Sequence, residues 1–188
     1  TRVVTSDSLI ERFGPGSEKI VRKNGVRSRR WAEQEKGETA AFMAARAAEL
    51  ALEEAGLQAT EVDLILNASG TQMRVIPDGG PWIQQELGLG ESGIPSMSVH
   101  ATCLGFFAGL DMASVFLQAG RYEKILLVAS EVAHAGVNPA DVKTVTLFGD
   151  GAAAAVLERA PEGSSAGLES ALFRTYAVGA ESTSVMGG

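Results

Sequence analysis

Cys103 is the side chain whose type and position are best suited to covalent chemistry. It is the only cysteine of the chain and follows a short β-prone run that begins at Pro95. The apolar segment 104–119 predicts a buried helix, which Gly120 is well placed to end. Cys103 would then lie near the first helical turn, where unpaired N–H groups and the helix dipole favour a thiolate. These N–H groups could also hold the oxyanion formed when a thiolate attacks a thioester carbonyl.

Position alone leaves a second interpretation of Cys103 open, because free cysteines are often small hydrophobic residues of a core. A cysteine nucleophile also needs a base. The two histidines, His100 and His134, are far apart in the sequence and have no neighbouring cysteine. Their spacing therefore predicts no metal site.

A second candidate site is a basic run that no acid interrupts. Its members within segment 20–31 are Arg22, Lys23, Arg27, Arg29 and Arg30. Because the formal net charge of the chain is −7, this cluster is the main candidate for binding a phosphate or an acidic partner. A solvated turn is the alternative interpretation.

The composition excludes several classes of protein. With 188 residues, 45% of them hydrophobic and 21% charged, the chain is predicted to be a globular protein with a single domain. No apolar run reaches the roughly 18–20 residues of a membrane span. The acidic balance argues against nucleic acid as a partner. A single cysteine cannot form an internal disulfide, which fits a cytoplasmic location.

The segments around Cys103 alternate between helical and strand patterns, which predicts an α/β fold. Helices are expected from Thr5 or Ser6 to Phe13, from Thr39 to Ala55, from about Pro81 to Leu87, and over 104–119. Strands are expected over 62–68, 95–99, 123–130, 152–157 and 167–177, the last pairing antiparallel with the one before it. Gly105 and Gly109 lie four residues apart, so their side of the helix is expected to approach another backbone closely.

A third motif, Gly149-Asp150-Gly151, lies between two expected strands, the first of which covers 144–148. The glycines predict a tight turn with positive φ. The Asp150 carboxylate is expected to accept hydrogen bonds from backbone amides, which is a structural rather than a catalytic role.

Three motifs resemble segments of the thiolase superfamily, specifically of β-ketoacyl-acyl-carrier-protein synthase III and its relatives. Segment 23–29, Lys-Asn-Gly-Val-Arg-Ser-Arg, resembles that family's Arg-Thr-Gly-Ile-Arg-x-Arg. Segment 101–106, Ala-Thr-Cys-Leu-Gly-Phe, resembles its nucleophile motif, Ala-x-Cys-x-Gly-Phe. Segment 148–152, Phe-Gly-Asp-Gly-Ala, is similar to that family's Phe-Gly-Asp-Gly-Ala turn. The order and separations of the motifs also agree, over nearly the whole chain.

The resemblance implies a layered fold, α-β-α-β-α when complete, built from two related halves. Residues 1–188 would be the N-terminal half, a mixed sheet flanked by helices, without the family's opening strand. Cys103 would accept an acyl group from an acyl thioester, which a decarboxylative Claisen condensation would extend in fatty-acid or polyketide synthesis. The histidine and asparagine that assist condensation in the family would come from the C-terminal half.

The resemblance also implies partners and further site residues. Lys23, Arg27, Leu104 and Phe148 would contact the substrate, with Leu104 trimming the acyl pocket. Where relatives carry a tryptophan that stacks on coenzyme A, this chain has Lys19, and the family's nucleotide-clamping arginine falls near Val142 or Lys143. These departures favour acyl carrier protein over coenzyme A as donor. No permanently bound cofactor is expected.

Neither His100 nor His134 matches the family's catalytic histidine, so we interpret both as structural or substrate-lining. A homodimer is expected, formed through the strand before the nucleophile, with loop 70–80 reaching toward the neighbouring subunit's site. Acyl transfer to oxygen or nitrogen of a natural product and head-to-head acyl condensation stay open as alternative reactions. A non-catalytic partner subunit of a synthase is the alternative of another class.

Overall fold

A four-stranded mixed sheet forms the centre of the computed structural model, which describes residues 1–74 and 76–182. The strands are β1 (Arg2–Thr5), β2 (Ser28–Trp31), β3 (Leu64–Asn67), β4 (Ser96–Ser98), β5 (Lys124–Glu131) and β6 (Gly151–Glu158). The α-helices are α1 (Ser6–Phe13), α2 (Glu18–Lys23), α3 (Ala40–Ala55), α4 (Gly79–Glu86), α5 (Gly105–Gln118) and α6 (Val142–Val145). In the central sheet the order is β4-β3-β5-β6, with β3 parallel to both neighbours and β6 antiparallel to β5.

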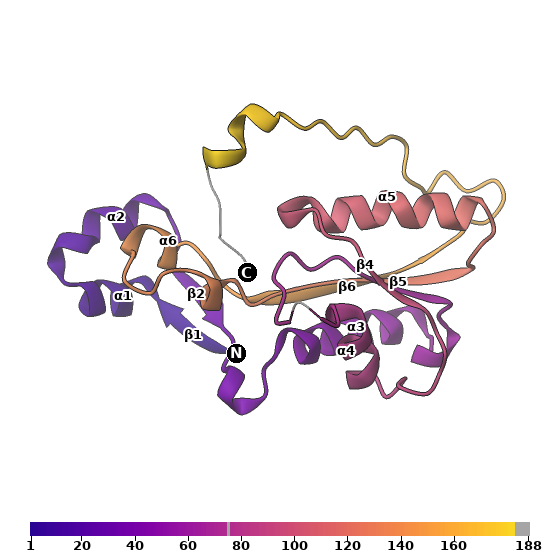
Figure 1. Ribbon diagram of the computed structural model, residues 1–188, viewed down its shortest axis with the longest axis horizontal. Coiled ribbons are helices and arrows are strands. Elements are labelled where there is room, and N and C mark those ends of the chain that lie inside the picture. The colour runs from indigo at the N-terminus through magenta and orange to yellow at the C-terminus, as the bar shows by residue number, and fades with distance from the viewer. Residues whose placement is uncertain (75, 183–188) are drawn as a thin grey trace.

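Helices cover both faces of this sheet. Figure 1 shows α5 on one face and α3 with α4 on the other. The side chains of β3 alternate between these layers: Ile65 packs in the core with α3 and α4, whereas Leu64 and Leu66 pack in the core with α5. Every residue of β3 is buried, which is typical of a strand that is covered on both faces.

The ends of the expected helices follow local signals in the sequence. The Thr39 hydroxyl accepts a hydrogen bond from the Phe42 N–H at 3.1 Å and caps α3. Gly56 ends the same helix in the left-handed conformation, with φ of 68°. Both features follow from helix geometry, because the first N–H groups and last carbonyls lack partners within the helix. The predicted boundaries of α3 are confirmed.

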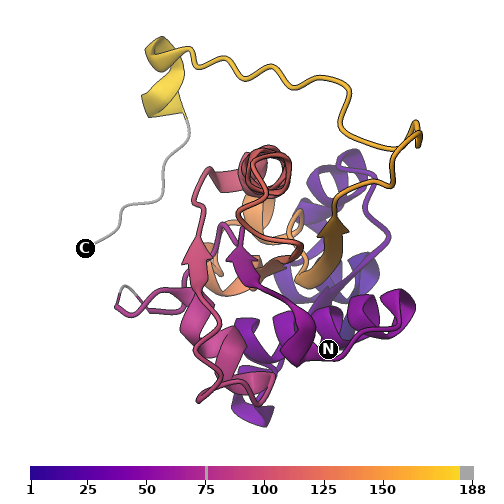
Figure 2. The ribbon, with the colours of Figure 1, turned by 90° about the vertical axis from the view of Figure 1, so that its right-hand side faces the viewer.

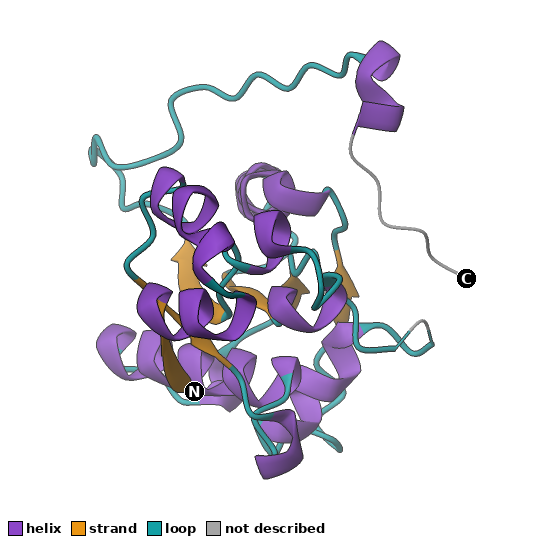
Figure 3. Ribbon diagram, turned by 90° about the vertical axis from the view of Figure 1, so that its left-hand side faces the viewer, coloured by secondary structure: helices purple, strands orange, loops and turns teal. Residues whose placement is uncertain are grey.

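A smaller unit adjoins one end of the sheet. Strands β1 and β2 pair antiparallel there, and α1, α2 and α6 gather beside them (Figures 1 and 3). Arg29 of β2 is buried, and its guanidinium donates to Thr146 O at 2.7 Å, Ser6 Oγ at 3.2 Å and Val4 O at 3.4 Å. One basic side chain thus joins β1, the start of α1 and the segment after α6.

Two predicted strands are wrong. Residues 142–145 of the segment before Gly149 form the short helix α6, which Asp141 caps through the Lys143 N–H. Segment 167–177 forms no strand; residues 167–176 are exposed and extended, and η6 (Ala177–Ser182) follows. Figure 2 shows this segment leading away from β6. An alternating pattern forms a strand only where a neighbouring strand offers hydrogen bonds and a core accepts one face, and no described strand pairs with this segment.

The predicted positive φ at Gly149 and Gly151 is also wrong, because neither is among the glycines with that conformation. Close approach explains Gly149 instead. A Cβ placed on it would lie 3.0 Å from the Arg29 Cβ and 3.4 Å from the Arg30 carbonyl oxygen. The turn before β6 therefore packs directly on β2.

Candidate active site

Cys103 lies at the carboxyl edge of the parallel strands, as the sequence predicts. It is exposed and sits in a 3₁₀ turn, η4 (Thr102–Leu104), that leads directly into α5 at Gly105. Loops at this edge hold the ligand sites of open α/β sheets. The alternative interpretation, in which Cys103 is a small hydrophobic residue of the core, is wrong because the side chain is exposed.

The amides that follow Cys103 are engaged within the turn. The Leu104 N–H donates to Ala101 O at 3.0 Å, and the Gly105 N–H donates to Thr102 O. These two groups are therefore not free for an oxyanion in this conformation. Use of helix-start amides as an oxyanion site stays a prediction.

The start of α5 packs against the end of β3. A Cβ on Gly105 would lie 2.4 Å from the Ala68 carbonyl oxygen, and one on Gly109 would lie 2.7 Å from Leu127 Cδ1. The predicted close approach of this side of the helix is confirmed. It brings Cys103 next to the loop after β3.

Glu131, the last residue of β5, lies at the same edge of the sheet, and the sequence interpretation did not single it out. Its carboxylate accepts from the Gly70 N–H at 2.5 Å and from the Thr71 N–H at 2.7 Å. The signal was present in the sequence: a carboxylate at the carboxyl end of a buried parallel strand lies at the edge where ligand sites form.

Asp150 accepts hydrogen bonds from backbone amides, as predicted. Its buried carboxylate accepts from the Ala32 N–H at 2.7 Å and the His134 N–H at 3.0 Å, and it also contacts His134 Nδ1. The His134 ring stacks on Trp31, with centroids 5.1 Å apart. Asp150 therefore joins β2 to the loop after β5, and His134 has a structural role here.

The basic run does not act as one surface. Arg29 is buried, and this burial lowers the pKa of its guanidinium. Arg22 forms ion pairs with Glu18 at 2.8 Å and Asp7 at 3.5 Å, which raise its pKa, Glu18 contributing most. Lys23 and Arg27 are exposed. A solvated surface is the better interpretation of Arg22, and the charges free to meet an acidic partner are fewer than the sequence suggested.

The two apolar side chains assigned to the substrate are both accessible. Leu104 is 52% exposed and follows Cys103 directly, and Phe148 is 43% exposed in the segment before Gly149. The Phe148 carbonyl accepts from Trp31 Nε1 at 3.1 Å. Their contact with substrate stays a prediction, as does that of Lys23 and Arg27.

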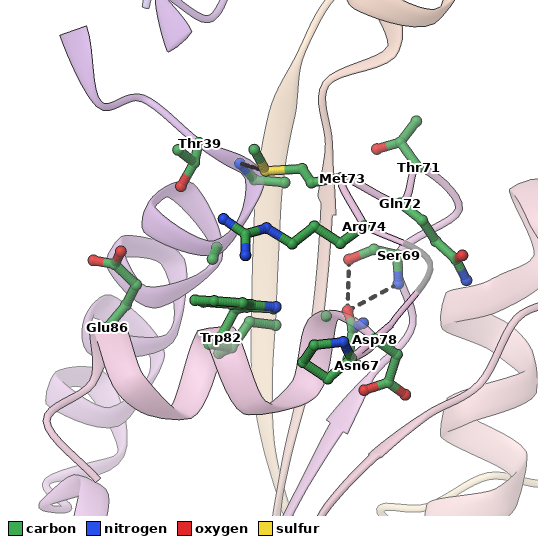
Figure 4. A pocket seen from close by; sticks show the side chains of 15 residues that line it. Thr39, Asn67, Ser69, Thr71, Gln72, Met73, Arg74, Asp78, Trp82 and Glu86 are labelled. Carbon is green, nitrogen blue, oxygen red and sulfur yellow. Dashed lines mark hydrogen bonds between the residues drawn. The ribbon is translucent and has the colours of Figure 1, made fainter. Parts of the chain in front are cut away.

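A cavity of about 230 Å³ opens between the starts of α3 and α4 and the loop after β3. Figure 4 shows Arg74 above the Trp82 ring, and its guanidinium carbon lies 4.2 Å from the ring centroid. Asp78 and Glu86 also line this cavity, but Cys103 does not. The wall formed by Ile83 belongs to the core on the α3 side of the sheet, so the cavity lies across the sheet from α5.

In residues 1–74 and 76–182, His, Cys, Asp and Glu side chains nowhere form a group that could hold a metal ion. None of the helices in the described part of the chain has the length and apolar character that crossing a membrane requires.

Comparison with known proteins identifies one family. Residues 97–176, which include Cys103 and the turn at Asp150, match the family of 3-oxoacyl-[acyl-carrier-protein] synthase III. The β-ketoacyl-[acyl-carrier-protein] synthase III of Methylococcus capsulatus is 38% identical over 161 residues, covering 86% of this chain and 49% of the relative. That of Laribacter hongkongensis is 34% identical over 155 residues, covering 82% and 47%. The chain spans about half the length of the curated relatives it matches.

Solved structures share the fold. The 3-oxoacyl-[acyl-carrier-protein] synthase III of Aquifex aeolicus superposes with a TM-score of 0.77 at 32% identity, covering 86% of this chain and 51% of that one. The priming β-ketosynthase of the R1128 polyketide pathway superposes with a TM-score of 0.74 at 29% identity, covering 85% and 46%.

Proposed function

Because this chain is a β-ketoacyl-acyl-carrier-protein synthase III-like member of the thiolase superfamily, we propose that its protein is an acyltransferase that forms an acyl-enzyme on Cys103. The observation that carries the proposal is an exposed cysteine on the turn that opens α5, within the segment that matches the family. A nucleophile must be accessible and held at a defined position, and this turn supplies both conditions.

Acylation on Cys103 would proceed by thioester exchange. The Sγ thiolate attacks the carbonyl carbon of an acyl thioester, and a tetrahedral oxyanion forms. Collapse of this intermediate breaks the bond between the carbonyl carbon and the donor's sulfur. The donor leaves as a thiolate and takes up a proton, and the acyl group stays on Cys103 as a new thioester.

The second stage would be a Claisen condensation, in fatty-acid or polyketide synthesis. A malonyl thioester loses carbon dioxide, its carbanion attacks the acyl carbonyl, and the Cys103 thiolate leaves. The resemblance assigns assistance in this stage to a histidine and an asparagine of the family's C-terminal half. Two similar proteins fit the two pathways, since one is named a synthase III and the other a priming β-ketosynthase of a polyketide pathway.

Acyl carrier protein is the proposed donor and partner. The exposed charges of Lys23 and Arg27 suit an acidic protein surface. Coenzyme A is the second candidate donor, although Lys19 stands where the resemblance places a stacking tryptophan. The substrate arrives as a thioester, and we propose no permanently bound cofactor.

A homodimer is proposed as the working form, formed through β4. This strand is an edge of the sheet in the described chain, so one side of it offers unpaired backbone groups.

Mass spectrometry tests the acyl-enzyme. Incubation of the full-length natural protein with an acyl thioester is expected to add the mass of one acyl group to the peptide that contains Cys103. The Cys103→Ala variant should show no adduct and should lose turnover almost completely. An unmodified Cys103, together with equal turnover in Cys103→Ala, would instead favour a non-catalytic partner subunit.

A further inference from the structure

We propose that Glu131 is a positioning residue for Cys103: its carboxylate holds the loop after β3, and that loop in turn supports the turn that carries the thiol. This inference rests on the proposed function for its catalytic consequence, but its structural part stands on geometry alone. The parts come from three separate strands, since Glu131 ends β5, Gly70 follows β3, and Thr102 follows β4.

The carboxylate uses both of its oxygens on neighbouring backbone amides. Oε1 accepts from the Gly70 N–H at 2.5 Å, and Oε2 accepts from the Thr71 N–H at 2.7 Å. Hydrogen bonds to an ionised acceptor are shorter and stronger than those between neutral groups. A neutral amide at this position would have one acceptor oxygen, and its NH₂ group would face an N–H.

The loop makes two further hydrogen bonds with the same end of β5, in which its hydroxyl groups accept. The Thr71 hydroxyl accepts from the Val132 N–H at 3.0 Å, and the Ser69 hydroxyl accepts from the Ser130 N–H at 2.9 Å. Residues 69–71 are therefore tied to both neighbours of Glu131. The carboxylate adds the one charged contact in this set.

Gly70 transmits this restraint to the nucleophile turn. A Cβ placed on Gly70 would lie 3.4 Å from Glu131 Oε1 and also 3.4 Å from the Thr102 carbonyl oxygen. A side chain atom at this position would be in ordinary van der Waals contact with both groups, so Gly70 lies between the Glu131 carboxylate and the residue that precedes Cys103. A shift of the loop away from Glu131 would remove a wall of the nucleophile turn.

That turn needs such support because its backbone is strained. Thr102 has φ of 48° and is the one non-glycine residue with positive φ in the part of the chain that the structure describes. A β-branched residue rarely adopts this conformation, which persists only where surrounding structure enforces it. The packing of Gly105 against Ala68 O restrains the other side of the turn.

The test combines backbone hydrogen exchange with acylation in the full-length natural protein. In Glu131→Gln, exchange within residues 69–71 and also within residues 101–105 is expected to accelerate about tenfold, because local opening no longer breaks charged hydrogen bonds. Exchange within 43–52 of α3 should stay unchanged. Single-turnover acylation of Cys103 should slow about tenfold, since small displacements of reacting groups lower rates strongly.

Two further variants complete the experiment. Glu131→Asp keeps the charge and both acceptor oxygens, so it should recover most of the protection at 101–105 and most of the acylation rate. Glu123→Gln changes an exposed acid just before the opposite end of β5 and should match the wild type.

Each outcome decides a separate point. Faster exchange at 69–71 with unchanged exchange at 101–105 would overturn the proposal, as would equal acceleration at 43–52, which indicates general destabilisation. Coupled exchange in a protein whose Cys103 is never acylated would preserve the positioning role and overturn the proposed function.

Discussion

Arg29 shows at the residue scale how one side chain type serves different purposes. The sequence placed it in a basic cluster for anion binding, yet it is buried, and its guanidinium donates to neutral oxygens of Val4, Ser6 and Thr146. An arginine offers five donors in a rigid fork, so it can join several backbone segments at once. The number of donors, rather than the charge, explains its place here.

Asp150 provides a prediction at the same scale. Asp150→Asn keeps the shape of the side chain but removes its charge. The NH₂ group replaces one acceptor oxygen, so it faces a backbone N–H or the His134 ring that the carboxylate contacts in the wild type. The free energy of unfolding is expected to fall by about 2 kcal/mol, in line with hydrogen bonds to a charged group. Urea unfolding measures this change.

A control distinguishes this effect from loss of charge in general. Glu158→Gln, at the exposed end of β6, should change stability by less than about 0.5 kcal/mol. Equal stability of Asp150→Asn and the wild type would show that the carboxylate does not hold β2 and the loop after β5 together.

Helix α5 owes its position to two glycines with different neighbours. Gly105 faces a fixed backbone oxygen, whereas Gly109 faces the end of a flexible leucine side chain. Gly105→Ala is therefore expected to destabilise the protein by about 2 kcal/mol through overpacking. In Gly109→Ala, the helix gains about 1 kcal/mol of propensity, which offsets the small shift of Leu127.

Thermal or urea unfolding of the two variants, side by side, measures this difference. Because both substitutions add one methyl group to the same helix, each is the control for the other. Equal stability of the two variants would contradict the close contact between the start of α5 and the end of β3.

The apolar outer side of α5 is a feature of the whole molecule. Phe107 is 61% exposed and Val115 is 56% exposed. Patches of exposed large apolar residues usually mark interaction surfaces. These two side chains make the outer side of α5 a candidate interaction surface.

The proposed homodimer yields a prediction at this scale. Sedimentation of the full-length natural protein is expected to give twice the mass of one chain. Pro95 and Val99 bond to β3 through their backbones, so the alternate residue Ser96 directs its N–H toward the outer edge of β4. Ser96→Pro removes this outer donor and is expected to shift the protein toward monomer. Circular dichroism must first show a folded protein. A monomeric wild type would rule out the dimer.

Local patterns in the sequence correctly predicted α1, α3, α4 and α5 and the strands of the central sheet, but not the elements α2, α6, β1 and β2. Thr39 and Gly56 define the ends of α3 through hydrogen bonds that the chain makes with itself nearby. The motif around Cys103 also predicted the turn before α5. These features depend on residues close in sequence, and local chemistry is sufficient for them. The amides that meet Asp150 belong instead to Ala32 and His134, and tertiary packing brings them to the carboxylate.

Tertiary structure alone decided the remaining features. Segment 167–177 has the alternation of a strand but no partner in the described chain, because pairing depends on a distant edge. The burial of Arg29 and the contact of Glu131 with Gly70 and Thr71 join residues that lie far apart in the sequence. A sequence read alone gives the type of such side chains, whereas the packing of the strands decides which backbone groups they meet.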